Sequence, residues 1–266
     1  MVKAKYLFSL VILFLFSHAV VGQVLNIERL RLERDTTTSF KSKITAGMNI
    51  YNRSSAANEP VNLFGYNIDV NTLYYPGKHA FMGLAKFDYL KVNNEDFLNF
   101  GFVHFRVNYF RKNPINFENY IQYSYDNFRG LLPRLLGGGG IRWNTFKSKS
   151  LSLVIGVGAL YEYEKWTHPE TNQTIEIALV KSSNYISFRW TANENVDINF
   201  VGYYQTGYDS DISAFRNRTN ASLILNTKIA KRISFANSFD ISYEHKPIVP
   251  IIKTIYTFKT GLSIDL

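Results

Sequence analysis

The stretch SLSLVIGVGALYEYE, residues 150–164, alternates apolar with polar or small side chains along most of its length. One face carries Leu151, Leu153, Ile155, Val157, Ala159, Tyr161 and Tyr163, and the other carries Ser152, Gly156, Gly158, Glu162 and Glu164. Alternation with period two over about 12–15 residues is typical of a strand that crosses a membrane, with its apolar face toward lipid and its polar face toward a barrel interior.

The same pattern recurs through the rest of the chain, for example in NRTNASLILNTKIA (217–230) and ISFANSFDISYE (233–244). Twelve such segments are predicted, at about 39–52, 61–75, 80–92, 97–111, 115–126, 132–146, 150–164, 178–191, 195–207, 217–230, 233–245 and 252–266. An even number of strands is expected of a closed single-chain bacterial barrel whose two ends face the periplasm. The predicted fold class is therefore all-β, a transmembrane antiparallel β-barrel of about twelve strands.

The connections between these segments differ in length according to their position. Odd-to-even connections such as RSSAANEP (53–60) and KWTHPETNQTIE (165–176) are mostly long, whereas even-to-odd connections such as PGKH (76–79) and AKR (230–232) are short. This difference predicts short periplasmic turns and longer extracellular loops.

The first 23 residues, MVKAKYLFSLVILFLFSHAVVGQ, combine two lysines, an apolar run from Tyr6 to Phe16, and small residues at Val20 and Gly22. This order predicts a cleaved secretory signal peptide at residues 1–22, in preference to a buried helix. We expect a periplasmic segment at 23–38 and the barrel at 39–266. The chain has no cysteine, so an exported protein of this kind needs a large core or a membrane to stabilise it. The expected location is the cell outer membrane.

Aromatic residues make up 16% of the chain and fall near the predicted strand ends, where amphipathic rings meet lipid headgroups. The expected girdle consists of Tyr74, Tyr75, Tyr89, Tyr109, Trp143, Tyr163, Trp190 and Tyr256. Outer-membrane lipids are thus the first expected partner. The second is the barrel insertion machinery, because the last predicted strand ends on an apolar residue, Leu266.

The glycine run in PRLLGGGGIRWN (133–144) resembles a phosphate-binding loop, but the residues after Gly140 are Ile141 and Arg142, which excludes a Walker motif, and Arg142 also breaks a dinucleotide fingerprint. Pairing Phe146 with Ser150 would instead place Gly140 opposite Gly156 and Gly138 opposite Gly158. These four structural glycines predict either curvature or a hollow in the inner wall. Inward Tyr120 and Tyr185 are the candidates to occupy such a hollow.

Many charged residues fall on the predicted inner face. The candidate lumen-lining residues are Lys41, Lys43, Lys86, Arg106, Glu118, Arg142, Glu162, Lys181, Arg189, Asp240 and Lys259. On the predicted register Arg134 lies opposite Glu162, and His104 lies beside Arg106. Such residues form either a paired network that fills the barrel or the lining of a narrow channel that prefers anions slightly. A small solute is the ligand class that a channel implies.

The sequence offers no catalytic constellation of recognised spacing, and we expect no catalytic residues, no cofactor and no metal site. The alternative is a lipase- or protease-type barrel enzyme whose acids Asp209, Asp211 and Glu244 converge on His245 at the rim. The net charge is +9, but the bases are dispersed over the strands, so nucleic-acid binding is not expected.

The opening NIERLRLERDTTTSFKSKITAGMNI (26–50), the alternating strands and the RLLGGGGIRW hairpin (134–143) together resemble the salt-induced outer-membrane protein family. These YdiY-like proteins, here in the version found in Bacteroidota, are known as a domain of unknown function. The resemblance implies an outer-membrane barrel and brings no catalytic residues. We therefore expect a non-enzymatic barrel, as a narrow channel or an envelope-stress protein. A receptor or adhesin that binds through loops 165–177 and 208–216 is a further alternative.

Overall fold

A computed structural model describes residues 39–54, 60–230 and 233–264 of the chain. The predicted signal peptide (1–22) and periplasmic segment (23–38) lie outside the described residues, as does the C-terminal Leu266. Among the described residues, no helix is long and apolar enough to cross a membrane.

Twelve strands account for most of the described chain, and the prediction of twelve strands is confirmed. Their bounds are β1 (Phe40–Ser54), β2 (Pro60–Tyr74), β3 (Ala80–Val92), β4 (Glu95–Tyr109), β5 (Ile115–Asp126), β6 (Leu131–Lys147), β7 (Leu151–Thr167), β8 (Thr174–Asn193), β9 (Val196–Asp209), β10 (Ala214–Ala230), β11 (Ile233–Glu244) and β12 (Thr254–Ile264). A single turn of 3₁₀ helix, η1 (Asn127–Arg129), lies between β5 and β6.

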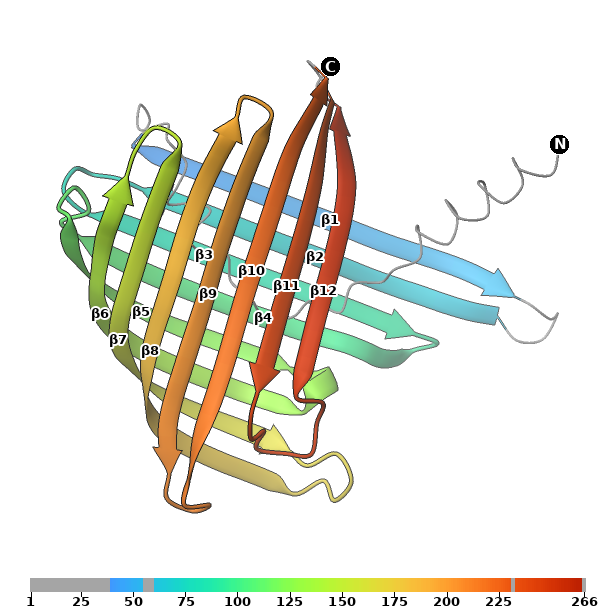
Figure 1. The fold of residues 1–266 in the computed structure, drawn as a ribbon. Helices are drawn as coiled ribbons and strands as arrows, with labels where there is room; N and C mark the ends of the chain where they lie inside the picture. The colour runs from blue at the N-terminus through green and yellow to red at the C-terminus, as the bar shows by residue number, and fades with distance from the viewer. Residues whose placement is uncertain (1–38, 55–59, 231–232, 265–266) are drawn as a thin grey trace, which may run out of the picture.

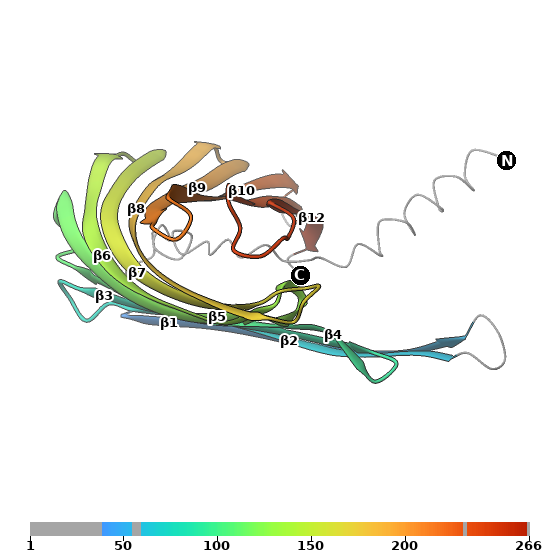
Figure 2. The ribbon, with the colours of Figure 1, turned by 90° about the horizontal axis from the view of Figure 1, so that it is seen from below.

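The strands form one antiparallel sheet in which each strand pairs with the next along the chain (Figure 1). The sheet curls so that β1–β5 and β9–β12 face each other across the interior (Figure 2). Between the edge strands β1 and β12, the described residues show no ladder, so the barrel has a seam where a closed barrel was expected.

The two faces of the sheet differ as the alternation predicts. On β5, Phe117, Ile121 and Tyr123 are exposed on the outer face, whereas Glu118 and Gln122 are buried on the inner face. A curled antiparallel sheet with an apolar outside and a charged inside has the architecture of a transmembrane β-barrel, because the backbone groups between paired strands are satisfied within the sheet and the outer side chains meet lipid.

The difference in connection length is smaller than predicted. The odd-to-even connection between β3 and β4 is only Asn93–Asn94, and the one between β7 and β8 shortens to residues 168–173. Much of the sequence assigned to the latter loop continues the strands, since Lys165 pairs with Glu176 and Trp166 with Ile175. Residues 245–253, between β11 and β12, form a long connection on the predicted extracellular side.

The hairpin of β6 and β7 shows the main error in the predicted register. Gly140 pairs with Gly158 and Gly138 with Leu160, a shift of two residues from the predicted pairs. At the turn the offset is three residues, because Phe146 pairs with Leu153 where Ser150 was predicted, and a bulge beside Thr145, whose hydroxyl donates to the carbonyl of Leu153 at 3.0 Å, reduces the offset to two. Because a shift of two residues leaves every side chain on its face, the predicted inner and outer faces of the hairpin are correct.

Candidate functional site

Buried charged side chains from five strands and η1 meet in the half of the interior toward the odd-to-even connections. We call this group the ionic cluster. It consists of the carboxylates of Glu162 and Glu164 on β7 and Glu244 on β11, with Arg129 of η1, Arg134 on β6, Lys181 on β8 and Arg218 on β10. All but Arg129 belong to residues that are buried.

Arg218 connects all three carboxylates of the ionic cluster. Its Nη1 lies 2.8 Å from Glu162 Oε1, its Nη2 lies 2.8 Å from Glu164 Oε1, and its Nε lies 3.4 Å from Glu244 Oε1. Arg134 Nε donates to Glu162 at 2.6 Å and lies 3.2 Å from Glu164, and Lys181 Nζ also binds Glu162. The predicted contact between Arg134 and Glu162 is thus present, although Glu164 is the residue opposite Arg134 in the ladder.

Four cations share three carboxylates in this cluster. Desolvation of so many charges costs free energy, which the mutual attraction and the hydrogen bonds must offset. A fully connected arrangement of this kind fixes the relative positions of the strands that contribute to it. In this part of the interior the charged residues form a paired network, which is one of the two arrangements that the sequence allowed, the other being the lining of a narrow channel.

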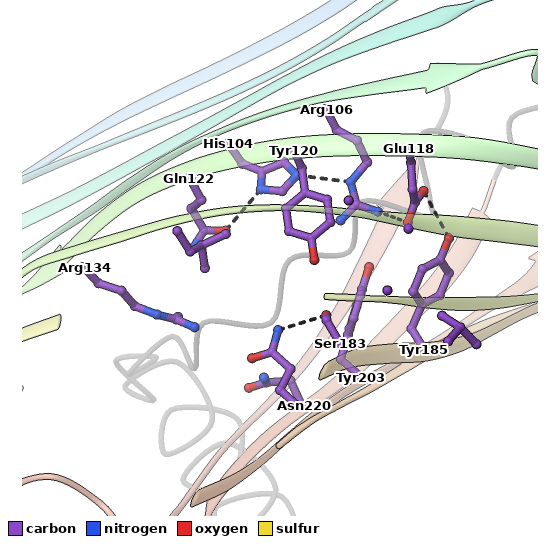
Figure 3. A pocket seen from close by; sticks show the side chains of 16 residues that line it. His104, Arg106, Glu118, Tyr120, Gln122, Arg134, Ser183, Tyr185, Tyr203 and Asn220 are labelled. Atoms are coloured by element: carbon purple, nitrogen blue, oxygen red, sulfur yellow. Dashed lines mark hydrogen bonds and ion pairs between the residues drawn. The ribbon is translucent and has the colours of Figure 1, made fainter. Parts of the chain in front are cut away.

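A second group of polar side chains surrounds a cavity of about 70 Å³ beside the ionic cluster. Figure 3 shows His104, Arg106, Glu118, Tyr120 and Gln122 from β4 and β5 on one side, and Ser183, Tyr185, Tyr203 and Asn220 from β8–β10 on the other. A cavity of this volume with polar walls has room for water or a small ion.

The β4–β5 side of the cavity is joined by a chain of hydrogen bonds. Arg106 Nε donates to His104 Nε2 at 3.3 Å, and His104 Nδ1 lies 3.2 Å from Gln122 Oε1. Because a guanidinium can only donate, Nε2 of His104 is the acceptor and Nδ1 carries the proton that reaches Gln122. Arg106 also lies 3.3 Å from Glu118 and 4.7 Å from the ring centre of Tyr120. The predicted proximity of His104 and Arg106 is confirmed.

Tyr185 links the two sides of the interior. Its hydroxyl donates to Glu118 Oε2 on β5 at 3.2 Å and accepts from Arg142 Nη1 on β6 at 3.1 Å. Its ring lies 5.3 Å from that of Tyr203. Tyr185 therefore reaches from β8 across β7 to residues on β5 and β6.

The glycines of β6 and β7 make this crossing possible. A Cβ atom at Gly156 would overlap the ring of Tyr185, and one at Gly138 would lie 2.9 Å from Cζ of Tyr120. Both tyrosines predicted to occupy the hollow do so. Gly140 and Gly158 lie opposite each other, and a Cβ at Gly140 would meet the backbone of β7, at 2.5 Å from the carbonyl oxygen of Val157.

The outward glycines of β6 differ from each other. A Cβ at Gly137 has no neighbour nearer than 3.8 Å, whereas one at Gly139 would overlap the amide of Asn119 and lie 3.0 Å from the carbonyl oxygen of Glu118. A larger side chain at Gly139 therefore requires Asn119 to move. Gly137 is the tolerant position.

The other predicted lumen residues lie on the inner face but outside these two groups. Lys86 Nζ is 3.2 Å from Asp88 Oδ2 on β3, and Arg189 Nε is 3.0 Å from Asp197 Oδ1 across β8 and β9; both pairs are only half-buried. On the inner faces of the edge strands and β11, Lys41 and Asp240 are half-buried and Lys43 and Lys259 exposed.

Arg129 and Val249 belong to the described interior but were not predicted, because both lie in connections. Alternation with period two assigns faces only within strands. The pair of Arg216 and Asp209, whose Nε and Oδ2 lie 2.6 Å apart, falls in sequence that was assigned to a loop, because β9 and β10 extend beyond their predicted ends.

The rim acids do not converge on His245. Asp209 binds Arg216, and Glu244 points inward to Arg218. His245 is exposed, and its Nδ1 lies 3.3 Å from the hydroxyl of Tyr243, which faces outward. Within the described ranges, no group of three or more His, Asp or Glu residues is arranged to hold a metal ion.

The fold and the charged interior define a class, the transmembrane β-barrels built from antiparallel strands. Within this class, residues 62–264 match the family described as "Protein of unknown function, DUF481", and the chain belongs to this family. The family resemblance drawn from the sequence is confirmed.

Two solved structures match most of this chain at low sequence identity. The NanC porin is 12% identical with a TM-score of 0.42, over 84% of this chain and 99% of the porin. OmpT, an outer membrane protein of Vibrio cholerae, is 11% identical with a TM-score of 0.28, over 85% of this chain and 95% of OmpT. A search of curated proteins finds no match.

Proposed function

We propose that this protein is a non-enzymatic β-barrel of the outer membrane that passes small polar solutes through a narrow interior. The apolar outer face supports a membrane location, and the features of residues 1–22 support export.

The proposal is carried by two half-buried ion pairs on the inner wall. Lys86 with Asp88 and Arg189 with Asp197 keep part of their charged groups accessible within the interior, unlike the ionic cluster. Charged side chains around a pore set which ions enter it. Because basic residues outnumber acidic ones in the chain, 30 to 21, we expect a mild preference for anions.

Conductance across a planar bilayer tests this proposal. The purified barrel should produce stepwise currents, and Arg189→Gln should shift the reversal potential in a salt gradient toward cation preference. The substitution leaves Asp197 two hydrogen bonds, from Thr191 at 2.9 Å and from Asn199 at 2.7 Å. The pair that includes Arg189 is therefore removed without leaving its partner unsatisfied.

Lys165→Gln is the matched control. It also removes one positive charge, but from an exposed side chain. Lys165 pairs with Glu176 near the end of the β7–β8 hairpin, beyond the ionic cluster. The control should leave the reversal potential unchanged. A barrel that is electrically silent, or one in which both substitutions have the same effect, would contradict the proposed channel.

A further inference from the structure

The connection between β11 and β12, residues 245–253, folds back over the interior. Val249 is 2% exposed and packs with Leu131 at the start of β6 and Trp166 near the end of β7. Ile175 of β8 and Ile248 and Ile251 of the connection itself complete this apolar contact. In both views the connection lies by the ends of the strands it contacts (Figures 1 and 2).

This contact spans the barrel, because β6 and β11 are separated by four strands in the sheet. We call residues 245–253 the lid. A second link crosses at the same level, where Arg129 Nη2 of η1 lies 3.4 Å from Glu244 Oε1, the residue immediately before the lid. Arg216 also donates to the carbonyl oxygen of Lys246 at 2.6 Å.

Glu244 is held less closely than the other carboxylates of the ionic cluster. Its oxygen lies 3.4 Å from both Arg129 and Arg218, whereas Arg218 approaches Glu162 and Glu164 to 2.8 Å. Pairs of oppositely charged groups bind best at about 2.7–2.9 Å. A small cavity of about 20 Å³ is lined by these same groups beneath the lid.

We propose that Arg129 and Arg218 form a binding site for the carboxylate or phosphate group of an anionic solute, which competes with Glu244 and so releases the lid. The two guanidinium groups supply donors suited to such a group. The role of this site depends on the proposed function, because a lid regulates the barrel only if solutes pass through it.

The mechanism requires that the anion bind better when the lid is open, because a ligand shifts an equilibrium only by its differential affinity for the two states. With the lid closed, Glu244 occupies the guanidinium groups and repels an incoming anion. With the lid open, the guanidinium of Arg129 and Nε of Arg218 are available, while Nη1 and Nη2 of Arg218 stay with Glu162 and Glu164. The direction of coupling therefore follows from the charge of Glu244.

Cysteine labelling measures the position of the lid directly, because the full chain has no cysteine of its own. Val249→Cys places a thiol in the buried contact, and Ile252→Cys places one in the same lid at a position that is 78% exposed. In an uncharged detergent, a water-soluble maleimide should label Cys at 249 about tenfold more slowly than at 252, the protection that burial of one such side chain can support.

Inorganic phosphate is the probe anion, and chloride at equal ionic strength controls for screening. Phosphate should accelerate labelling at 249 and leave labelling at 252 unchanged. Glu244→Gln should produce the fast rate at 249 without phosphate. Arg129→Gln should abolish the difference between phosphate and chloride.

Three results would overturn the proposal. The first is equal labelling at 249 and 252 in the absence of phosphate, and the second is an equal effect of phosphate and chloride on labelling at 249. The third is labelling at 249 that vesicles of anionic lipid accelerate and phosphate does not, which would assign the site to lipid headgroups. Labelling does not depend on conductance, so a barrel that is electrically silent but whose lid responds to phosphate would refute the channel and leave the anion site standing.

Discussion

Replacing a single glycine of β6 tests how closely the inner wall is packed. Gly140→Val would place a Cβ atom 2.5 Å from the carbonyl oxygen of Val157 and 2.8 Å from Cα of Gly158. Both neighbours belong to the backbone of β7 and cannot rotate away. The two strands must therefore separate or twist, and overpacking of this kind costs about 1–3 kcal/mol.

Gly137→Val is the matched control on the same strand. Its Cβ atom would have no neighbour nearer than 3.8 Å and would point to the lipid side. Removing a glycine from a strand interior is worth about 0.5–1 kcal/mol in backbone entropy, so this variant should be neutral or more stable than the parent. The two variants should differ by about 1.5 kcal/mol or more, the sum of the two lower bounds.

The free energy of unfolding, measured by urea titration of the barrel folded in lipid vesicles, provides the comparison. The loss of the heat-modifiable band on gels gives an independent readout of the folded fraction. Equal stabilities of the 137 and 140 variants would show that the assignment of inner and outer faces on β6 is wrong.

Two further substitutions probe the interior. Glu162→Gln should destabilise the barrel by about 3–5 kcal/mol in the same titration, because it removes the carboxylate that several buried cations share. Glu176→Gln, which breaks an exposed ion pair, should cost at most about 1 kcal/mol. Similar losses for the two variants would mean that the ionic cluster is hydrated. Gly156→Ala should destabilise the parent because its methyl group overlaps the ring of Tyr185, but should have little effect in a Tyr185→Ala background. Additive losses in that cycle would argue against occupation of the hollow by the tyrosine.

The sequence predicts the strands and their faces well because both depend on one local property. Alternation with period two is enforced along every strand by the difference between lipid and interior, so the outward position of Ile121 and the inward position of Gln122 follow from the pattern alone. The inward tyrosines, Tyr120 and Tyr185, could be assigned to the glycine hollow for the same reason.

Features that depend on connections could not be predicted in this way. The register of β6 and β7 differs from the predicted one because the turn pairs Phe146 with Leu153, and alternation encodes neither the length of a turn nor the bulge beside Thr145. The lid is a stronger case, since nothing in the local sequence around Val249 specifies that it packs against Trp166, 83 residues earlier in the chain. The contact becomes visible only when the curl of the sheet brings β6 and β7 opposite β11.

The inward glycine at position 156 then explains how a thin wall supports a charged interior. A β-barrel of this size has no separate core, so inward side chains must themselves connect distant strands. Because β7 lacks a side chain at Gly156, Tyr185 can lie over it and hold Glu118 and Arg142 together from β8. A methyl group at that position would separate these groups without removing any charge. The glycines therefore act on the polar network through the space they leave, and the cost of their backbone freedom is offset by hydrogen bonds that cross β7.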